Sequence, residues 1–342
     1  MFIKKIVIWG HKLHSHTHSY IHNGFYIAFK HLGYDTYWYD DNDDVSAIDF
    51  SCSLFITEHQ VNKKIPCRND CIYISHYVDP EDYPGVPKEN IIILKNSPRD
   101  FNECDKNKGY VYQNLNYGIP HEYFSICDGY KCLYMYWATD LLPEEIDKNI
   151  ENLPNSSGDR RSPTELVVGG VNAPLPNLQI SYKINFIGSM TSVWKQLYFI
   201  CNSYKIPFYN YGATFNVNSH ANKSIQENIQ LIQSSLISPA LQDEHQIKLK
   251  YIPCRIFKNI SYGKMGMTNN EFVYELFDKK ILFHKDIHEL FKMGLQFEKR
   301  LDNNIIVKPL MEYVRDNHTY LNRIHTIKQF LDEYTSFSLG YS

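Results

Sequence analysis

The sequence has no apolar run that approaches the roughly 18 residues needed to span a lipid bilayer. Its first ten residues turn polar too soon for a signal peptide. None of its eight cysteines forms a CxxC pair, and a chain of 342 residues does not depend on disulfides for its stability. We therefore expect free thiols, no structural zinc site, no transmembrane segment and a cytoplasmic location.

A large excess of one charge sign is also missing. The chain has 35 Lys and Arg against 38 Asp and Glu, a net charge of -3 with neutral histidine. A general nucleic-acid binder usually carries a basic surface, so this balance argues against a nucleic-acid partner. Hydrophobic residues make up 43% of the chain, which excludes a disordered protein, and the length fits about two domains.

Two common nucleotide-binding motifs are absent as well. The chain has neither a Walker A sequence nor a GxGxxG fingerprint. Both NTP hydrolysis and a standard NAD site therefore lose support.

Short apolar runs do occur, and in the first half they alternate with a helical pattern. The spacing of apolar residues predicts a helix over 21–32. Nearly continuous apolar runs predict strands over 5–9, 35–39, 53–57, 71–75 and 91–94. This alternation favours the α/β class, with a parallel sheet covered on both faces.

A second alternation follows the segment 154–177, which is rich in Pro, Gly and polar residues and predicts a linker or mobile loop. We expect strands over 183–187, 207–211, 236–241 and 281–283, and helices over 193–204, 225–232, 247–260 and 272–277. A helical tail runs from 305 to about 337. The predicted domains are 1–165, 178–310 and a set of C-terminal helices, 311–342, that pack back towards the first domain.

Histidine is concentrated near the N-terminus, where six of the 15 fall between His11 and His31. Most lie in the loop that follows the first strand, and ligands of open α/β sheets bind beyond the carboxyl ends of strands. His14, His16 and His18 alternate, so an extended segment would place them on one side. A neutral imidazole is a good general base and a good metal ligand. We favour the base because no carboxylate lies nearby in sequence, and a solvated His-rich loop remains the alternative.

Asp79 occupies a similar position after the predicted strand 71–75. It could orient a histidine or accept a proton. A turn aspartate before Pro80 is the alternative.

The segment 251–270 predicts a phosphate site. Arg255, Lys258 and Asn259 have the i, i+3, i+4 spacing of one helix face, and a glycine-containing loop follows them. Glycines let an anion approach the backbone, and the next helix, near Asn270, offers free N–H groups. A solvated basic face followed by an ordinary turn is the alternative. Other candidate residues near the phosphates or the ribose are Gly188, Ser189, Gly263, Gly266, Thr268, Asn269 and Glu275.

The chain resembles the GT-B glycosyltransferases, and it is most similar in pattern to those of large DNA viruses and some bacteria. The similarity is carried by His16-Thr17-His18-Ser19-Tyr20-Ile21-His22-Asn23-Gly24-Phe25, by residues 32–38 and by 253–263. It implies two Rossmann-like domains facing a central cleft. It also implies a UDP- or GDP-linked sugar donor and no metal or other cofactor. Arg255 and Lys258 of the C-terminal half would neutralise the diphosphate.

The same resemblance implies that the N-terminal half binds a glycan or glycoprotein acceptor and deprotonates its hydroxyl. The candidate bases are His16, His18 and Asp79. A homodimer is compatible with the Tyr-rich surface, and a viral enzyme would act in the host cytoplasm. Two alternatives stay open: a metal-dependent hydrolase built on His14, His16 and His18, and a non-catalytic nucleotide or glycan binder. The sequence leaves the sugar and the stereochemistry open.

Overall fold

The computed structural model describes residues 1–13, 15–16, 18–58, 60–76, 79–97, 129–153, 182–188, 192–211 and 223–340, and the backbone of 113–114 and 123–127. The chain divides into two compact units, each assembled from separate segments. Unit 1 comprises Met1–Leu142, Lys248–Cys254 and Asp316–Ser342, and unit 2 comprises Pro143–Ile247 and Arg255–Arg315. The domain limits predicted near 165, 178 and 310 stay predictions. The predicted linker 154–177 lies outside the described residues.

Unit 1 is built on an eight-stranded sheet whose strand order is β3-β2-β4-β5-β6-β9-β8-β7. The first six strands of this order are parallel, and β7 and β8 add an antiparallel edge. The strands are β2 (Lys5–Trp9), β3 (Thr36–Tyr39), β4 (Ser53–Glu58), β5 (Ile72–His76), β6 (Ile91–Lys95), β7 (Gln113–Asn114), β8 (Tyr123–Cys127) and β9 (Tyr130–Tyr134). The predicted α/β class and parallel sheet are confirmed.

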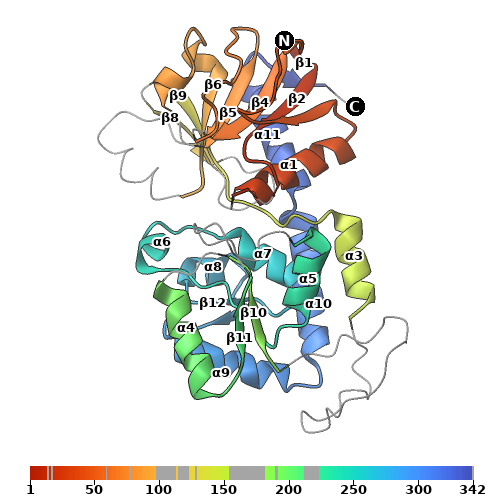
Figure 1. The fold of residues 1–342 in the computed structure, drawn as a ribbon, viewed down its shortest axis with the longest axis vertical. Coiled ribbons are helices and arrows are strands. Elements are labelled where there is room, and N and C mark those ends of the chain that lie inside the picture. Colours follow the sequence, from red (N-terminus) through yellow and green to blue (C-terminus); the bar gives the residue numbers. More distant parts are fainter. Residues whose placement is uncertain are drawn as a thin grey trace. The chain divides into compact units, whose positions relative to one another are not determined.

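Both faces of this sheet are covered. Side chains alternate along β2, so Ile6 and Ile8 join one core cluster while Val7 and Trp9 join another. The first cluster includes apolar residues of α1 (Ser19–His31) and α11 (Tyr320–Tyr334), which pack against each other (Figure 1). The second includes residues of the connections between strands and lies near η1 (Pro80–Asp82) and η2 (Lys88–Asn90).

The last segment of the chain completes unit 1. The strand β14 (Ser338–Leu339) pairs in parallel with β1 (Phe2–Ile3). Upstream of it, Arg323 of α11 is fully buried and donates to the carbonyl oxygens of Tyr136 at 2.7 Å and Trp137 at 3.2 Å. These bonds attach α11 to the segment that follows β9.

The described part of unit 2 contains two pairs of short parallel strands surrounded by helices. The pairs are β10 (Ile184–Phe186) with β11 (Phe208–Asn210), and β12 (Met267–Thr268) with β13 (Leu282–Phe283). The helices are α3 (Pro143–Glu151), α4 (Ser192–Ser203), α5 (Ile225–Gln233), α6 (Glu244–Lys248), α7 (Cys254–Ser261), α8 (Glu271–Leu276), α9 (Ile287–Glu298) and α10 (Asn303–Asn317). Every helix among the described residues is too short or too polar to cross a membrane.

Two predicted elements of unit 2 are wrong. The strand expected over 236–241 is reduced to a single bridge between Ala240 and Thr268, because Pro239 offers no N–H to a ladder. The helix expected over 247–260 is interrupted after Lys248 and begins again at Cys254. Lys250 has a φ of +54°, outside helical geometry, and Pro253 immediately precedes the new helix.

Candidate functional sites

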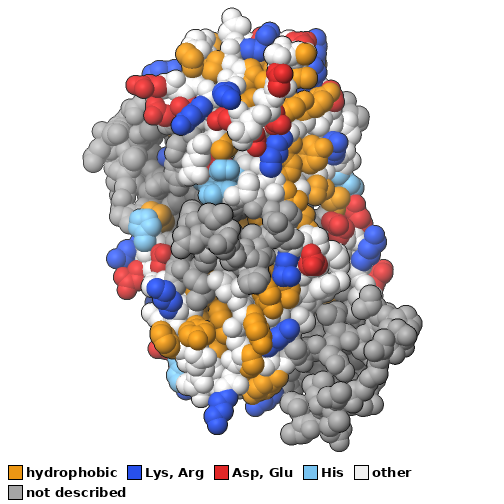
Figure 2. All heavy atoms as spheres, viewed as in Figure 1, with side chains coloured by type: hydrophobic (Ala, Val, Ile, Leu, Met, Phe, Trp, Pro, Cys, Tyr) orange, Lys and Arg blue, Asp and Glu red, His pale blue; other side chains and the backbone are white. Residues whose placement is uncertain are grey.

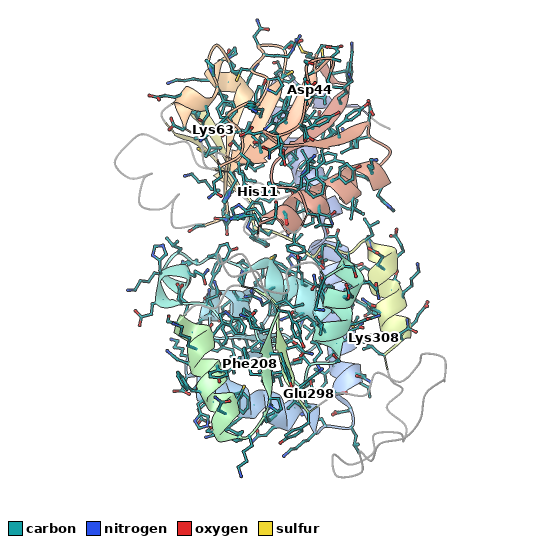
Figure 3. The ribbon with its side chains drawn as sticks, viewed as in Figure 1. His11, Asp44, Lys63, Phe208, Glu298 and Lys308 are labelled. Atoms are coloured by element: carbon teal, nitrogen blue, oxygen red, sulfur yellow. The ribbon has the colours of Figure 1, made fainter. Side chains whose placement is uncertain are left out.

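The first candidate site lies in unit 1, where three neighbouring strands end. Glu58 ends β4 and pairs in register with His76, which ends β5, while His11 follows β2 by two residues (Figure 3). Carboxyl ends of adjacent parallel strands meet at one edge of a sheet, which brings these side chains together. The loop before α1 adds His16 and His18 to the same group.

Glu58 is the centre of this histidine cluster and is only 2% exposed. Its two carboxylate oxygens have different partners. Oε2 accepts a hydrogen bond from Nδ1 of His18. Oε1 lies 3.6 Å from Nε2 of His11 and 3.6 Å from Nε2 of His22. A single buried carboxylate therefore faces three imidazoles.

The protonation of the cluster follows from burial and these contacts. Burial would raise the pKa of Glu58, but the hydrogen bond from His18 and the potential of the other imidazoles outweigh burial and hold that pKa at about 2. Burial lowers the pKa of His22 to about 4. Burial and the neighbouring His18 lower the pKa of His76 to about 3. At neutral pH the site therefore contains a carboxylate anion, Glu58, and two neutral rings, those of His22 and His76.

Four rings of the cluster form a continuous chain of contacts. His11 and His16 stack with centroids 4.3 Å apart, and His16 meets His18 edge-on at 5.1 Å. His18 in turn meets His76 at 5.5 Å. Two overlapping sets have the donor types and spacing of a metal site: His11, His16 and Glu58, and His18, Glu58 and His76.

The structure separates the three bases predicted from the sequence. His16 and His18 both lie in the cluster. Asp79 is exposed and accepts from the backbone N–H of Glu81 at 3.2 Å, so its side chain caps the turn that enters η1. His14, the third member of the alternating histidines, lies outside the described residues.

Sequence reasoning missed Glu58, the carboxylate that it looked for beside the histidines. Glu58 lies 40 positions from His18, so proximity along the chain gave no signal. The available signal was its position directly after the predicted strand 53–57, since ligands of open α/β sheets bind beyond the carboxyl ends of strands. His76 follows the next strand and could have been found in the same way.

The second candidate site lies in unit 2, around Arg255 in the first turn of α7. The guanidinium carbon stands 4.8 Å from the ring centroid of Phe186 and 5.0 Å from that of Trp194. These two rings are themselves stacked, with centroids 3.7 Å apart. Nη2 of Arg255 donates to the carbonyl of Ile187 at 3.3 Å. The aromatic stack and the carbonyl therefore hold the guanidinium plane beside the end of β10.

Gly188 follows β10 at this point and has a φ of +144°. A Cβ built on it would lie 2.3 Å from Nη2 of Arg255, so the arginine occupies the space that a side chain would need. Lys258 lies one turn further along α7 and is partly exposed. Ser189, the next predicted donor-binding residue, lies outside the described residues.

The remaining predicted donor residues of unit 2 make internal contacts. Asn259 is 2% exposed, unlike Arg255 and Lys258, and its Nδ2 donates to the carbonyl of Ser238 at 2.7 Å. Asn269 exchanges two hydrogen bonds with the backbone of Gln242, at 2.9 and 2.8 Å.

The other four have packing, turn or surface positions. Thr268 is fully buried, and its Oγ1 accepts from the backbone N–H of Asn270 at 3.1 Å. A Cβ on Gly266 would lie 2.6 Å from the side chain of Ile281, and Gly263 turns the chain after α7 with a φ of +92°. Glu275 is exposed and pairs with Lys279 at 3.2 Å. A role of any of these residues in donor binding stays a prediction.

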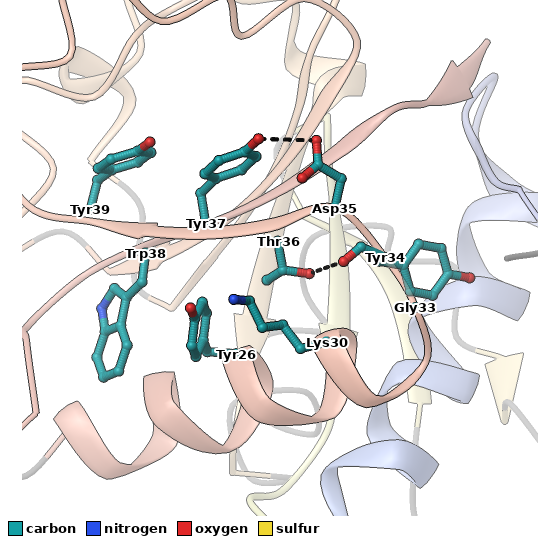
Figure 4. Close-up of a pocket in the computed structure, with 9 residues that line it drawn as sticks. All are labelled: Tyr26, Lys30, Gly33, Tyr34, Asp35, Thr36, Tyr37, Trp38 and Tyr39. Carbon is teal, nitrogen blue, oxygen red and sulfur yellow. Dashed lines mark hydrogen bonds between the residues drawn. The ribbon is translucent and has the colours of Figure 1, made fainter.

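A shallow groove of about 460 Å³ runs along the open edge strand β3 (Figure 4). Tyr37 and Tyr39 stand on one side of the strand, with ring planes 8° apart, and Trp38 stands on the other side against Tyr26. Asp35 accepts from the hydroxyl of Tyr37 at 3.2 Å.

Positive and negative side chains are interspersed over the face of the molecule that Figure 2 shows.

Comparison with known proteins gives a likeness in structure but not in sequence. No protein-family model matches the chain, and no curated protein matches it in sequence. The chain is similar to the DNA-modifying enzyme β-glucosyltransferase, whose crystal structure was determined with and without its substrate uridine diphosphoglucose. The sequence identity is 11% and the TM-score is 0.43, and the match covers 95% of this chain and 96% of that chain.

This finding corrects the expected partners. The matched enzyme modifies DNA, whereas the sequence led to a glycan or glycoprotein acceptor and to the exclusion of nucleic acid. That exclusion rested on the net charge of -3, which describes the whole chain and not any one surface. The charge balance does not exclude nucleic acid, and the glycan acceptor is withdrawn.

Proposed function

We propose that the chain is a glycosyltransferase of GT-B architecture that transfers a sugar from a UDP- or GDP-linked donor to an acceptor hydroxyl. The observation that carries the proposal is the fixed guanidinium of Arg255 beside Gly188. An arginine whose plane is held in advance loses little entropy when it binds a diphosphate through two parallel hydrogen bonds. The absent side chain at Gly188 leaves the room that this guanidinium needs to lie beside the end of β10.

Charge neutralisation in unit 2 would support departure of the nucleoside diphosphate. As the bond between the anomeric carbon and the diphosphate breaks, negative charge builds up on the leaving oxygen. Arg255 and Lys258 supply two positive charges on one face of α7, and the start of that helix adds a positive dipole. We propose that these groups replace a metal ion at the diphosphate.

Proton removal from the acceptor is assigned to His18. Its Nδ1 donates to Glu58, so Nε2 carries the lone pair that can take the proton as the acceptor oxygen attacks the anomeric carbon. Glu58 then stabilises the resulting imidazolium, which is the logic of an oriented catalytic histidine. His16 is less suited to this role, because its Nδ1 already accepts from the backbone N–H of His18 at 3.3 Å.

Donor binding tests the proposal directly. A panel of UDP-, GDP-, ADP- and CMP-sugars should give a thermal shift with one nucleotide class. Isothermal titration with that donor should show an affinity loss of about 10–100-fold in Arg255→Ala, because a charge-assisted hydrogen bond is lost. Arg300→Ala is the matched control, since Arg300 is an exposed arginine of the same unit paired with Asp302. A flat panel, or equal affinities in the Arg255 variant and wild type, contradicts the assignment.

Turnover separates an enzyme from a non-catalytic binder. An enzyme releases the nucleoside diphosphate in the presence of acceptor, and His18→Ala should slow this release while donor affinity stays unchanged. A donor that binds but is never consumed would favour the binder.

A further inference from the structure

Two buried atoms of the histidine cluster face each other without a hydrogen bond. Among the described residues, neither Oε1 of Glu58 nor Nε2 of His11 has a hydrogen-bond partner. They lie 3.6 Å apart, too far for a hydrogen bond between them. An unsatisfied buried carboxylate oxygen is costly, and buried charges in proteins are usually paired or bound to a metal ion.

The spacing of these atoms fits a tetrahedral ion. Two ligands that each lie about 2.1 Å from such an ion are about 3.4 Å from each other. The observed separation of 3.6 Å is close to this value. His16 offers a third ligand atom, and the three ligand atoms all lie within 4.8 Å of one another. A neutral imidazole has a single lone pair, so metal binding would replace the 3.3 Å hydrogen bond that Nδ1 of His16 accepts from the backbone N–H of His18.

The overlapping set of His18, Glu58 and His76 fits an ion less well. Its carboxylate oxygen, Oε2, already accepts a hydrogen bond from Nδ1 of His18, so an ion at that position would have to replace this bond. The ring of His76 is also packed edge-on against Trp137, with centroids 5.0 Å apart. The set on the Oε1 side has both the space and the unsatisfied atoms.

We propose that unit 1 binds one Zn²⁺ ion through His11, His16 and Oε1 of Glu58. Two imidazoles and a carboxylate suit Zn²⁺ better than Mg²⁺, which prefers oxygen ligands and octahedral geometry. Three protein ligands leave the fourth coordination position for water. The hydrogen bond from His18 to the other oxygen of Glu58 would orient the ligating carboxylate. This site goes beyond the proposed sugar transfer and does not depend on it.

Metal binding is measured on the full chain after treatment with a chelator. Titration with Zn²⁺ against a chromophoric competitor should give one ion per chain. His11→Ala and Glu58→Gln should each lower the affinity by about 100-fold or more, since loss of even an outer-shell partner typically costs 10–100-fold. His31→Ala is the matched control and should bind like wild type, because His31 is an exposed residue at the far end of α1. Co²⁺ in place of Zn²⁺ should give the intense visible absorption of tetrahedral coordination.

The titrations can either support or overturn the proposed Zn²⁺ site. No stoichiometric binding by wild type, or wild-type affinity in both variants, overturns the site. If Glu58→Gln does not fold, the His11→Ala variant still tests the site. His11 lies in a loop and its side chain is 21% exposed, so its replacement should leave the fold intact. Arg255→Ala should keep full Zn²⁺ affinity. A protein that binds Zn²⁺ but no nucleotide-sugar would therefore refute the sugar transfer and leave the metal site standing.

Discussion

Nη2 of Arg255 lies 2.3 Å from the position that a Cβ on Gly188 would take. Two residues 67 positions apart in sequence thus share one volume at the end of β10. A side chain at position 188 would therefore displace the guanidinium of Arg255.

Substitution Gly188→Ala tests this coupling. The new methyl group would displace the guanidinium from the Phe186 and Trp194 rings, so we expect donor affinity to fall by about tenfold or more, the worth of one charge-assisted hydrogen bond. Isothermal titration with the nucleotide-sugar measures the loss. Gly85→Ala is the control: Gly85 also has a positive φ, +77°, but a Cβ on it would have nothing within 4 Å, so only backbone strain is added. Undiminished donor affinity in Gly188→Ala would show that the position of Arg255 is unimportant.

Substitution Gly24→Ala tests the contact between α1 and α11. Alanine in a helix is favoured over glycine by about 0.5–1 kcal/mol. Here, however, the Cβ would lie 2.2 Å from the rigid ring of Tyr320, and overpacking costs about 1–3 kcal/mol. We expect a lower melting temperature, whereas Gly340→Ala, with open space around it, should melt like wild type. A higher melting temperature for Gly24→Ala would mean that α1 and α11 accommodate the methyl group without losing packing free energy.

Asn269 distinguishes a structural role from a ligand-binding one. Its side chain exchanges two hydrogen bonds with the backbone of Gln242, and Asn269→Ala removes both of them. Removing one partner of a buried hydrogen bond costs about 1–3 kcal/mol. Urea unfolding should show this loss, while the folded variant keeps its donor affinity. Normal stability combined with weak donor binding would instead place Asn269 at the donor.

The buried His318 predicts a pH dependence of stability. Burial lowers its pKa well below the ordinary value of 6.5, and Arg323 lowers it further. Nη2 of Arg323 lies 3.2 Å from Nδ1, so that nitrogen accepts a hydrogen bond and cannot hold a proton. At pH values between 6.5 and the lower pKa of the folded state, the His318 imidazole is protonated in the unfolded chain but not in the folded one.

The free energy of unfolding therefore falls as pH drops through that range, by up to about 1.4 kcal/mol per pH unit from this residue. His318→Asn keeps an acceptor for Arg323 and cannot be protonated, so its urea midpoint should fall less steeply between pH 7 and pH 5. Parallel curves for the two proteins would exclude His318 as the cause.

The sequence predicted most of the sheet of unit 1, because strands buried on both faces read as continuous apolar runs. The sequence also predicted that His16 and His18 lie in the loop that follows a strand. It missed Glu58 because strand order is a long-range property: nothing in a local window tells which strand lies beside β2. It mistook 236–241 for a strand because apolar character outweighed the missing N–H of Pro239.

The pairing of β1 with β14 makes unit 1 dependent on both ends of the described chain. During synthesis, the sheet and α1 emerge long before α11, so the part of α1 that packs against α11 stays uncovered until the segment beginning at Tyr320 has been made. Unit 2 lies almost entirely within that interval and can fold first. A ribosome that stalls before residue 320 would therefore hold a folded unit 2 beside an incomplete unit 1, which is the form of this protein most in need of a chaperone.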